Sequence, residues 1–166
     1  MSRGFVKEDD QEEAPFIPPR AALPDGIPNY VTPRGLRSLL EERTTLEQER
    51  ASVSGSDMER RRAQAEYDGR LALLNERIVT ARVVEPTTAH TDVRFGSTVT
   101  FTHVDGPQRG VERTITIVGV DEAAVKEQRI AFTAPIARAL IGKRSGDTAE
   151  FELGPTLLHL HITHIH

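Results

Sequence analysis

The chain has 166 residues, of which 37% are hydrophobic and 28% are charged, and its formal net charge is −4. This length suits one compact domain with an extension, and the slightly acidic charge excludes a general attraction to nucleic acid or acidic membranes. The absence of cysteine excludes disulfides and thiolate chemistry, and an aromatic content of 5% argues against a large aromatic-lined ligand pocket. The sequence shows neither a signal-peptide pattern nor an 18-residue apolar run, so it predicts a cytoplasmic protein without a membrane partner.

Residues 1–30 are predicted to form an acidic, proline-rich and extended tail. Acidic residues cluster at 8–10 and 12–13, and prolines follow at 15, 18, 19, 24 and 28. A segment of this composition buries little apolar surface, and its prolines prevent a helix. We therefore expect the tail to be largely disordered.

Residues 31–85 are predicted to form an antiparallel helical hairpin, a short coiled coil. Helical periodicity starts at Thr32-Pro33, stops at Ser54-Gly55-Ser56 and resumes from Asp57 to Ala81. The apolar stripe on each helix is narrow, which is typical of two helices that pack mainly on each other. This pattern indicates an arm that reaches into a partner.

The residues at coiled-coil spacing define the seam between the two helices. In the first helix they are Leu36, Leu39, Arg43, Leu46, Arg50 and Val53. In the second helix they are Arg60, Gln64, Tyr67, Leu71, Leu74, Ile78 and Ala81. The seam is apolar near the base and polar near the turn, so we expect firm packing at the base and loose packing at the distal end.

Two carboxylates at the predicted tip, Asp57 and Glu59, have two interpretations. They could hold a divalent ion or orient a water molecule in a partner's active site. Alternatively, Ser56 and Glu59 form a capping box while Asp57 faces the positive end of the helix dipole. The capping interpretation explains both acids and is favoured, which leaves them as weak catalytic candidates.

A basic run, Arg60, Arg61 and Arg62, follows the tip acids directly. Such a run is most simply a solvated helical face, and its functional interpretation is a contact with nucleic acid or with an acidic surface. The arginines would also partly neutralise any acidic focus at the tip.

Residues 90–166 are predicted to form a small α+β domain after a linker at Pro86-Thr87-Thr88. The hydrophobic period changes to two, which indicates antiparallel strands. We expect strands near 93–101, 114–118, 130–132, 149–153 and 158–162, and a short helix from Pro135 to Ile141 that stops at Gly142. Asp105-Gly106-Pro107 is typical of a hairpin loop.

Histidines near the C-terminus raise the question of a metal site. On a strand, His159 and His161 share one face, while His164 and His166 share the other. Two imidazoles on one face could bind zinc, but no cysteine or carboxylate accompanies them, so polar strand positions are favoured and no metal site is predicted. The sequence also shows no Ser-His-Asp order and no glycine-rich phosphate loop, and we expect a protein that is not an enzyme.

Several segments of the chain resemble the bacterial GreA/GreB family of transcription elongation factors. In the C-terminal half these are Val93–Thr100, Ile117–Ala123, Pro135–Lys143 and Gly146-Asp147. Around the hairpin they are Val31–Leu36 at its start and Ala81–Val84 at its end. The resemblance covers nearly everything from residue 30 onward, and the run Pro135–Lys143 is its most specific part.

The resemblance implies a fold and a partner. The C-terminal half would be an FKBP-like domain, an antiparallel sheet with one short helix, that docks at the rim of the secondary channel of RNA polymerase core enzyme. The hairpin would enter that channel, so contact with nucleic acid would be indirect, through the transcription complex. Docking would involve the positions that match the family's docking loop, namely Thr133, Ala134 and Pro135, together with Arg138.

The chain departs from the family pattern at the tip of the hairpin, in the length of its helices and in the docking loop. The family's tip carries two acids three positions apart in a Gly-Asp-Leu-x-Glu-Asn type motif, whereas Asp57 and Glu59 are two apart. Each hairpin helix is shorter by roughly two heptads, about 20 Å of reach. Thr133-Ala134-Pro135 stands where the family often has Asp-Ser-Pro, which removes a charge but retains the proline.

These residues lead to one expected function and two alternatives. We expect a polymerase-binding elongation regulator that occupies the secondary channel without efficient transcript cleavage and that needs no cofactor of its own. The first alternative is a cleavage-stimulating factor that uses Asp57 and Glu59 with magnesium in the polymerase active site. The remote alternative is an FKBP-like prolyl isomerase or binding module, which rests on the implied fold alone.

Overall fold

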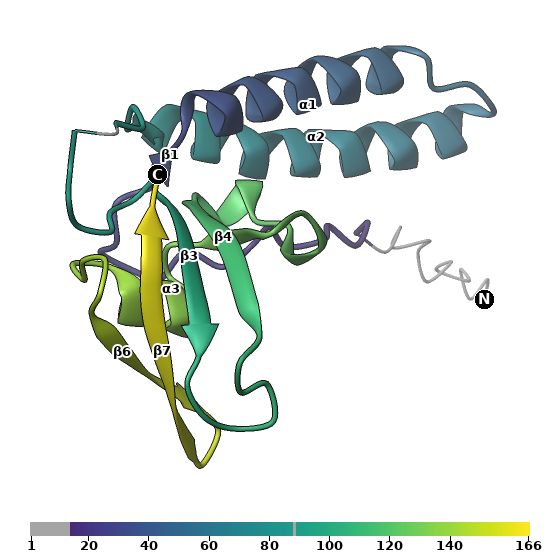
Figure 1. Cartoon of the computed structure of the whole chain (residues 1–166). Coiled ribbons are helices and arrows are strands. Elements are labelled where there is room, and N and C mark those ends of the chain that lie inside the picture. Colours follow the sequence, from purple (N-terminus) through teal and green to yellow (C-terminus); the bar gives the residue numbers. More distant parts are fainter. Residues whose placement is uncertain (1–13, 88) are drawn as a thin grey trace, which may run out of the picture.

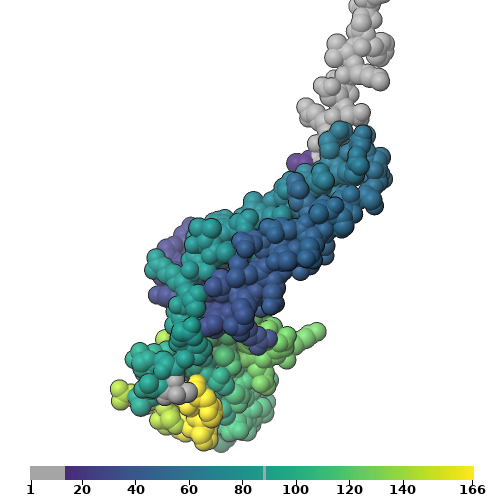
Figure 2. All heavy atoms as spheres, turned by 90° about the horizontal axis from the view of Figure 1, so that it is seen from above, coloured from purple at the N-terminus to yellow at the C-terminus, as the bar shows by residue number. Residues whose placement is uncertain are grey.

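A computed structural model describes residues 14–87 and 89–166 and confirms the predicted α+β architecture. A two-helix arm lies across one end of a small domain that is built on a single sheet (Figure 1). Viewed from above, the arm projects well beyond the C-terminal domain (Figure 2). Within the described ranges, neither long helix carries an apolar stretch that could cross a bilayer.

The arm consists of α1 (Pro33–Ala51) and α2 (Asp57–Thr80), which are 19 and 24 residues long. At 1.5 Å per residue the helices span about 28 and 36 Å. The Thr32 hydroxyl caps α1 by accepting a hydrogen bond from the amide of Gly35 at 2.9 Å, and Pro33 occupies the first turn. Gly55 has a φ of +120° in the connecting turn, a conformation that favours glycine.

The two helices are joined at their roots by a small parallel ribbon of β1 (Tyr30–Val31) and β2 (Arg82–Val83). The sequence pattern did not reveal this ribbon, because two-residue strands are too short to show a period of two. The second helix accordingly ends at Thr80, whereas its apolar spacing extended to Ala81.

The C-terminal domain contains five strands in the order β5-β4-β3-β7-β6. These are β3 (Thr98–His103), β4 (Glu112–Val118), β5 (Arg129–Ala131), β6 (Thr148–Leu153) and β7 (Thr156–Ile165). The helical elements are η1 (Val120–Glu122), η2 (Val125–Glu127) and α3 (Pro135–Leu140). The five neighbouring strands thus form a single sheet, with α3 against β6.

Two details of the sheet differ from the sequence expectation. The sheet is mixed, because β5 pairs with β4 in parallel while all other pairs are antiparallel. The connection between β4 and β5 passes through η1 and η2 and returns the chain in the same direction. The first strand begins at Thr98 rather than near Val93, because Gly96 adopts a φ of +85° in a turn that separates the two.

The apolar core is divided between the two parts of the molecule. In the C-terminal domain the fully buried side chains that are largest are Phe101, Ile117, Leu140, Leu160 and Ile162. A separate cluster in the arm contains Val31, Leu39, Leu46 and Leu74. Each part therefore has its own hydrophobic stabilisation.

The arm and the C-terminal domain meet at an aromatic cluster. The ring of Tyr30, from β1, lies 5.8 Å from Phe95 and 5.7 Å from Phe132, centroid to centroid. Beside it, the Thr32 hydroxyl donates to Glu122 of η1 at 2.6 Å. A Cβ atom at Gly119 would lie only 2.6 Å from the carbonyl oxygen of Tyr30, so the two backbones approach as closely as glycine allows.

Candidate functional site

The tip of the arm is organised by a capping box at the start of α2. The amide of Glu59 donates to the Ser56 hydroxyl at 3.3 Å, and the amide of Ser56 donates to the Glu59 carboxylate at 2.8 Å. The Ser56 hydroxyl donates to the same carboxylate at 2.7 Å. These hydrogen bonds, the one from the hydroxyl first, hold the pKa of Glu59 below its ordinary value. The carboxylate of Glu59 is therefore engaged in capping the start of α2.

The second tip acid is also engaged in a local contact. The carboxylate of Asp57 pairs with the guanidinium of Arg60, one turn further along α2, while its side chain is 80% exposed. Among residues 14–87 and 89–166, no three His, Asp or Glu side chains are grouped so that they could hold a metal ion. The tip offers at most two carboxylates, and both face a partner within the chain.

The seam of the arm changes from apolar to ionic toward the tip. Leu39, Leu46 and Leu74 are buried, and Leu71 and Ile78 pack against them. Beyond these residues the two helices are linked by the Arg50 guanidinium, which donates to the Asp68 carboxylate at 2.6 Å. The side chains of this ion pair are 41% and 56% exposed, so it contributes less than the buried leucines.

The basic run that follows the tip lies on the exposed surface of α2. Arg60, Arg61 and Arg62 all have exposed side chains, and Arg60 is turned toward Asp57. Three consecutive helical positions span most of one turn, so the run does not form a single flat basic face.

A second candidate surface surrounds the short helix α3. The structure places Thr133, Ala134, Pro135 and Arg138 together, with Pro135 at the first helical position. Thr133 and Ala134 are half-buried, whereas Pro135 and Arg138 are exposed and lie three positions apart on one face. The opposite face of α3 buries Ala137 and Leu140 in the core, so the exposed pair is held on a firmly anchored element.

An apolar hollow lies at Ile136 of the same helix, and no sequence pattern indicated it. It has a volume of about 250 Å³, and its apolar wall comes from Ile136 of α3, Phe151 and Leu153 of β6 and Leu158 of β7. Leu153 is 60% exposed at its edge. The lining residues are distant in the chain, so only the folded sheet brings them together.

The histidines of β7 do not gather into a cation site. The ring Nδ1 of His159 lies 2.6 Å from the carboxylate of Asp105, whose other oxygen accepts from the His159 amide at 2.9 Å. These hydrogen bonds, the one from the amide first, hold the pKa of Asp105 below its ordinary value. The rings of His164 and His166 stack on each other at 6.2 Å. The structure thus places a carboxylate beside His159, contrary to the expectation that none accompanies the histidines, although the described residues contain no group of three His, Asp or Glu that could hold a metal ion.

Comparison with known proteins identifies a family model and several relatives that match this chain. Residues 88–166 match the family model described as "Transcription elongation factor, GreA/GreB, C-term". Transcription elongation factor GreA of Hyphomonas neptunium is 46% identical over 88 residues, which are 52% of this chain and 54% of the relative. GreA of Neisseria meningitidis serogroup A is 40% identical over 91 residues, 54% of this chain and 56% of the relative. The chain thus spans about half the length of these curated relatives.

A longer match extends beyond the C-terminal domain. GreA of Brucella canis is 36% identical over 137 residues, which cover 72% of this chain and 85% of the relative. Among solved structures, the GreA homologue Gfh1 of Thermus thermophilus matches with a TM-score of 0.38 at 19% identity, covering 82% of this chain and 97% of that one. A GreA/GreB structure from Nitrosomonas europaea matches with a TM-score of 0.38 at 22% identity, covering 82% and 97%. On the strength of the sequence relatives, the chain belongs to the GreA/GreB family of transcription elongation factors.

Proposed function

We propose that this protein is an RNA polymerase-binding elongation regulator that acts at the secondary channel without efficiently stimulating transcript cleavage. It would work in the cytoplasm, where its partner is the core enzyme and its contact with nucleic acid passes through the transcription complex. The observation that carries the proposal is the state of the tip, where both acids are committed to contacts within the chain.

The chemistry of the tip supports the proposal that transcript cleavage is not efficiently stimulated. To help hold a second magnesium ion in the polymerase active site, carboxylates must be free to offer their oxygens to it. Here Glu59 would have to give up the capping box, and Asp57 would have to leave Arg60. Each exchange costs stabilising contacts at the start of α2, so these acids are poor ligands for a shared metal.

The length of the arm also supports a regulator that does not efficiently stimulate transcript cleavage. The Brucella canis alignment runs over 137 positions but covers 72% of the 166 residues, about 120, so about 17 positions of the relative have no counterpart here. The Hyphomonas neptunium alignment runs over 88 positions and covers 52% of the chain, about 86 residues, so it is nearly free of such gaps. We assign these unmatched positions to the arm, because the sequence of the hairpin departs from the family pattern.

Docking would use the surface around α3. An exposed proline and an exposed arginine sit on an anchored helix, beside an apolar hollow that could receive a side chain of the partner. Binding sites commonly combine such a hollow with a few polar groups at its edge. Thr133 and Ala134, which precede the helix, would line the same contact.

Binding is tested by capture of purified core polymerase on the immobilised protein. Replacement of Arg138 by Glu, or of Pro135 by Ala, should weaken binding by roughly fivefold or more, which corresponds to about 1 kcal/mol, the loss that only a minority of interface residues exceed. The matched control is Arg144→Glu, a charge reversal at another exposed arginine of the same domain. Equal binding by all three variants and the parent would place docking elsewhere.

Cleavage is tested on backtracked elongation complexes. We expect the protein to leave transcript cleavage near the rate of polymerase alone, while it competes with a cleavage-active factor for the same complex. Strong cleavage by the parent that is abolished by both Asp57→Ala and Glu59→Ala would establish the alternative, a cleavage-stimulating factor that works with polymerase-held magnesium.

A further inference from the structure

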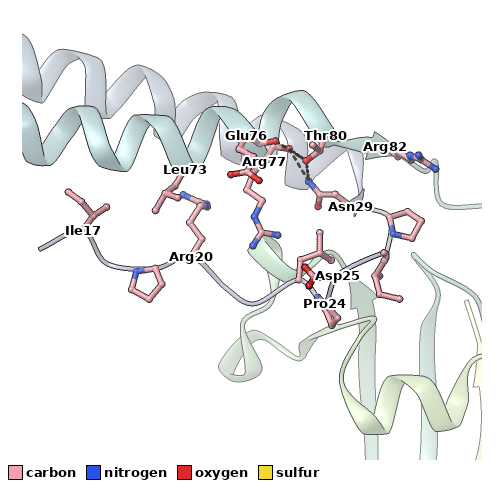
Figure 3. Close-up of a pocket in the computed structure, with 15 residues that line it drawn as sticks. Ile17, Arg20, Pro24, Asp25, Asn29, Leu73, Glu76, Arg77, Thr80 and Arg82 are labelled. Atoms are coloured by element: carbon pink, nitrogen blue, oxygen red, sulfur yellow. Dashed lines mark hydrogen bonds between the residues drawn. The ribbon is translucent and has the colours of Figure 1, made fainter.

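The segment from Ala14 to Asn29, here called the strap, runs extended between the arm and the C-terminal domain. Its contacts with both parts correct the expectation of a disordered tail for these residues, whereas residues 1–13 of that tail lie outside the described residues. Figure 3 shows it alongside α2, with Ile17 and Arg20 near Leu73 and with Asn29 near the end of the helix. A hollow of about 660 Å³ lies between the strap and α2, so the strap is held at discrete points rather than along its whole length.

One point of attachment lies partway along the arm. Ile17 sits against Gly69 of α2 so closely that a Cβ atom there would be 2.5 Å from the Ile17 Cδ1 atom. Gly69 lies 11 residues before the end of α2 at Thr80, which corresponds to about 16 Å along the helix axis. A larger residue at Gly69 would force this contact apart.

A second point of attachment holds the strap to the last turn of α2. The guanidinium of Arg77 donates to the carbonyl of Ala21, and the amide group of Asn29 donates to the carbonyl of Arg77 at 2.9 Å. Asn29 is 4% exposed, so its hydrogen bonds are shielded from water.

The third attachment joins the arm to the C-terminal domain through one arginine. The guanidinium of Arg20 donates to both carboxylate oxygens of Glu42 on α1, at 2.8 and 3.0 Å, and to Asp121 of η1 at 2.9 Å. Asp121 also lies 3.6 Å from Arg77. The side chains of Arg20 and Asp121 are only 17% and 7% exposed. Loss of Arg20 would leave a mostly buried carboxylate with one remote cation.

Two of these attachments, the contact of Ile17 with Gly69 and the ion pair of Arg20 with Glu42, lie at a distance from the joint itself. The ribbon, the aromatic cluster and the Thr32–Glu122 hydrogen bond all lie at the root of the arm. Glu42 lies nine residues along α1 from Pro33, about 14 Å from the root. A contact at that distance opposes rotation of the arm far more effectively than one at the pivot.

We infer that the strap is a brace that fixes the angle between the arm and the C-terminal domain, with Arg20 and Asp121 as its positioning residues. It determines the direction in which the arm points once the C-terminal domain is held by a partner. The inference concerns the free protein and stands whether or not the proposed function is correct.

The test measures the distance between the firmly packed part of the arm and the C-terminal domain. Because the chain contains no cysteine, Thr45→Cys, an exposed position of α1 next to buried Leu46, and Thr156→Cys give two unique sites for spin labels on the full-length protein. The parent should give one narrow distance distribution by pulsed electron paramagnetic resonance. Arg20→Met, which keeps the apolar stem but removes the ion pairs, should broaden it by about twofold or more while circular dichroism shows unchanged helix content.

The matched control is Arg50→Met, which removes an arginine ion pair inside the arm and should leave the distribution unchanged. Asp121→Asn removes the charge on the other side of the brace and should broaden the distribution as Arg20→Met does. Distributions of the two brace variants that superimpose on the parent would overturn the inference. A broad distribution in the parent itself would also overturn it, however the variants fold.

Discussion

The packing of the arm can be tested by removing one leucine from its seam. Leu74 is 0% exposed and lies in the cluster of Leu39, Leu46 and Val31. Leu74→Ala deletes three carbon atoms, for which the transfer term alone is about 2.4 kcal/mol at about 0.8 kcal/mol per methylene. The cavity left behind adds to this, so the loss should fall within about 2–5 kcal/mol.

The measurement is thermal and urea-induced unfolding followed by far-ultraviolet circular dichroism, which reports mainly on the arm helices. At roughly 2–4 °C per kcal/mol for a chain of this size, a loss of about 3 kcal/mol lowers the midpoint by about 6–12 °C. Val79→Ala is the matched control, because Val79 lies on the same helix but is 84% exposed. The control should change stability by no more than about 0.5 kcal/mol.

Hydrogen exchange on the same variants distinguishes the stability of the arm from that of the C-terminal domain. Protection should fall in α2 of Leu74→Ala, whereas β3 and β7 should retain theirs because their core is a separate cluster. If Leu74→Ala and Val79→Ala lowered the midpoint equally, the packed seam would not be the source of stability in the arm.

Four further predictions concern the seam, the tip and the joint. Amides of residues 48–62 should exchange faster than those of 70–82, since the distal seam is ionic and exposed; equal protection would contradict the graded seam. Ser56→Ala should cost about 1 kcal/mol by loss of the N-cap. Because the pKa of Glu59 is lowered in the folded arm, its contribution is present above the unfolded pKa and disappears as pH falls through the folded value. The stability difference between the parent and Glu59→Gln, measured by urea unfolding, should therefore narrow from roughly pH 6 to pH 3, and a constant difference would exclude this source. Gly119→Ala should destabilise the joint by about 1–3 kcal/mol through steric overlap with a backbone carbonyl of β1, and an unchanged melting temperature would show that the backbones can separate freely.

Features with a local cause were visible in the sequence. The capping box needs only Ser56 and a glutamate three residues later, and the seam needs only the spacing of Leu39 and Leu46 within α1 and of Leu71 and Leu74 within α2. Pro135 likewise indicated the start of α3, with Gly142 just beyond its end. In each case the determining residues lie within one or two helical turns of each other.

Features that depend on distant partners were not visible. Arg20 and Asp121 are 101 positions apart, and neither lies in a pattern that announces an ion pair. The parallel pairing of β5 depends on the path through η1 and η2 rather than on the three residues of the strand. The apolar hollow beside α3 exists only because β6 and β7 bring Phe151 and Leu158 next to Ile136. These contacts are products of the tertiary fold, so local periodicity carries no record of them.

The parallel ribbon of β1 and β2 has a consequence for how this architecture can vary. The arm begins after Val31 and ends before Arg82. The strands that contain these two residues are held side by side by main-chain hydrogen bonds, and these bonds do not depend on the length of the helices between them. Helical turns can therefore be gained or lost in matched pairs, one in each helix, without disturbing the C-terminal domain. One heptad in each helix changes the length of the arm by about 10 Å. The length of the arm can therefore change in evolution without a change in the C-terminal domain.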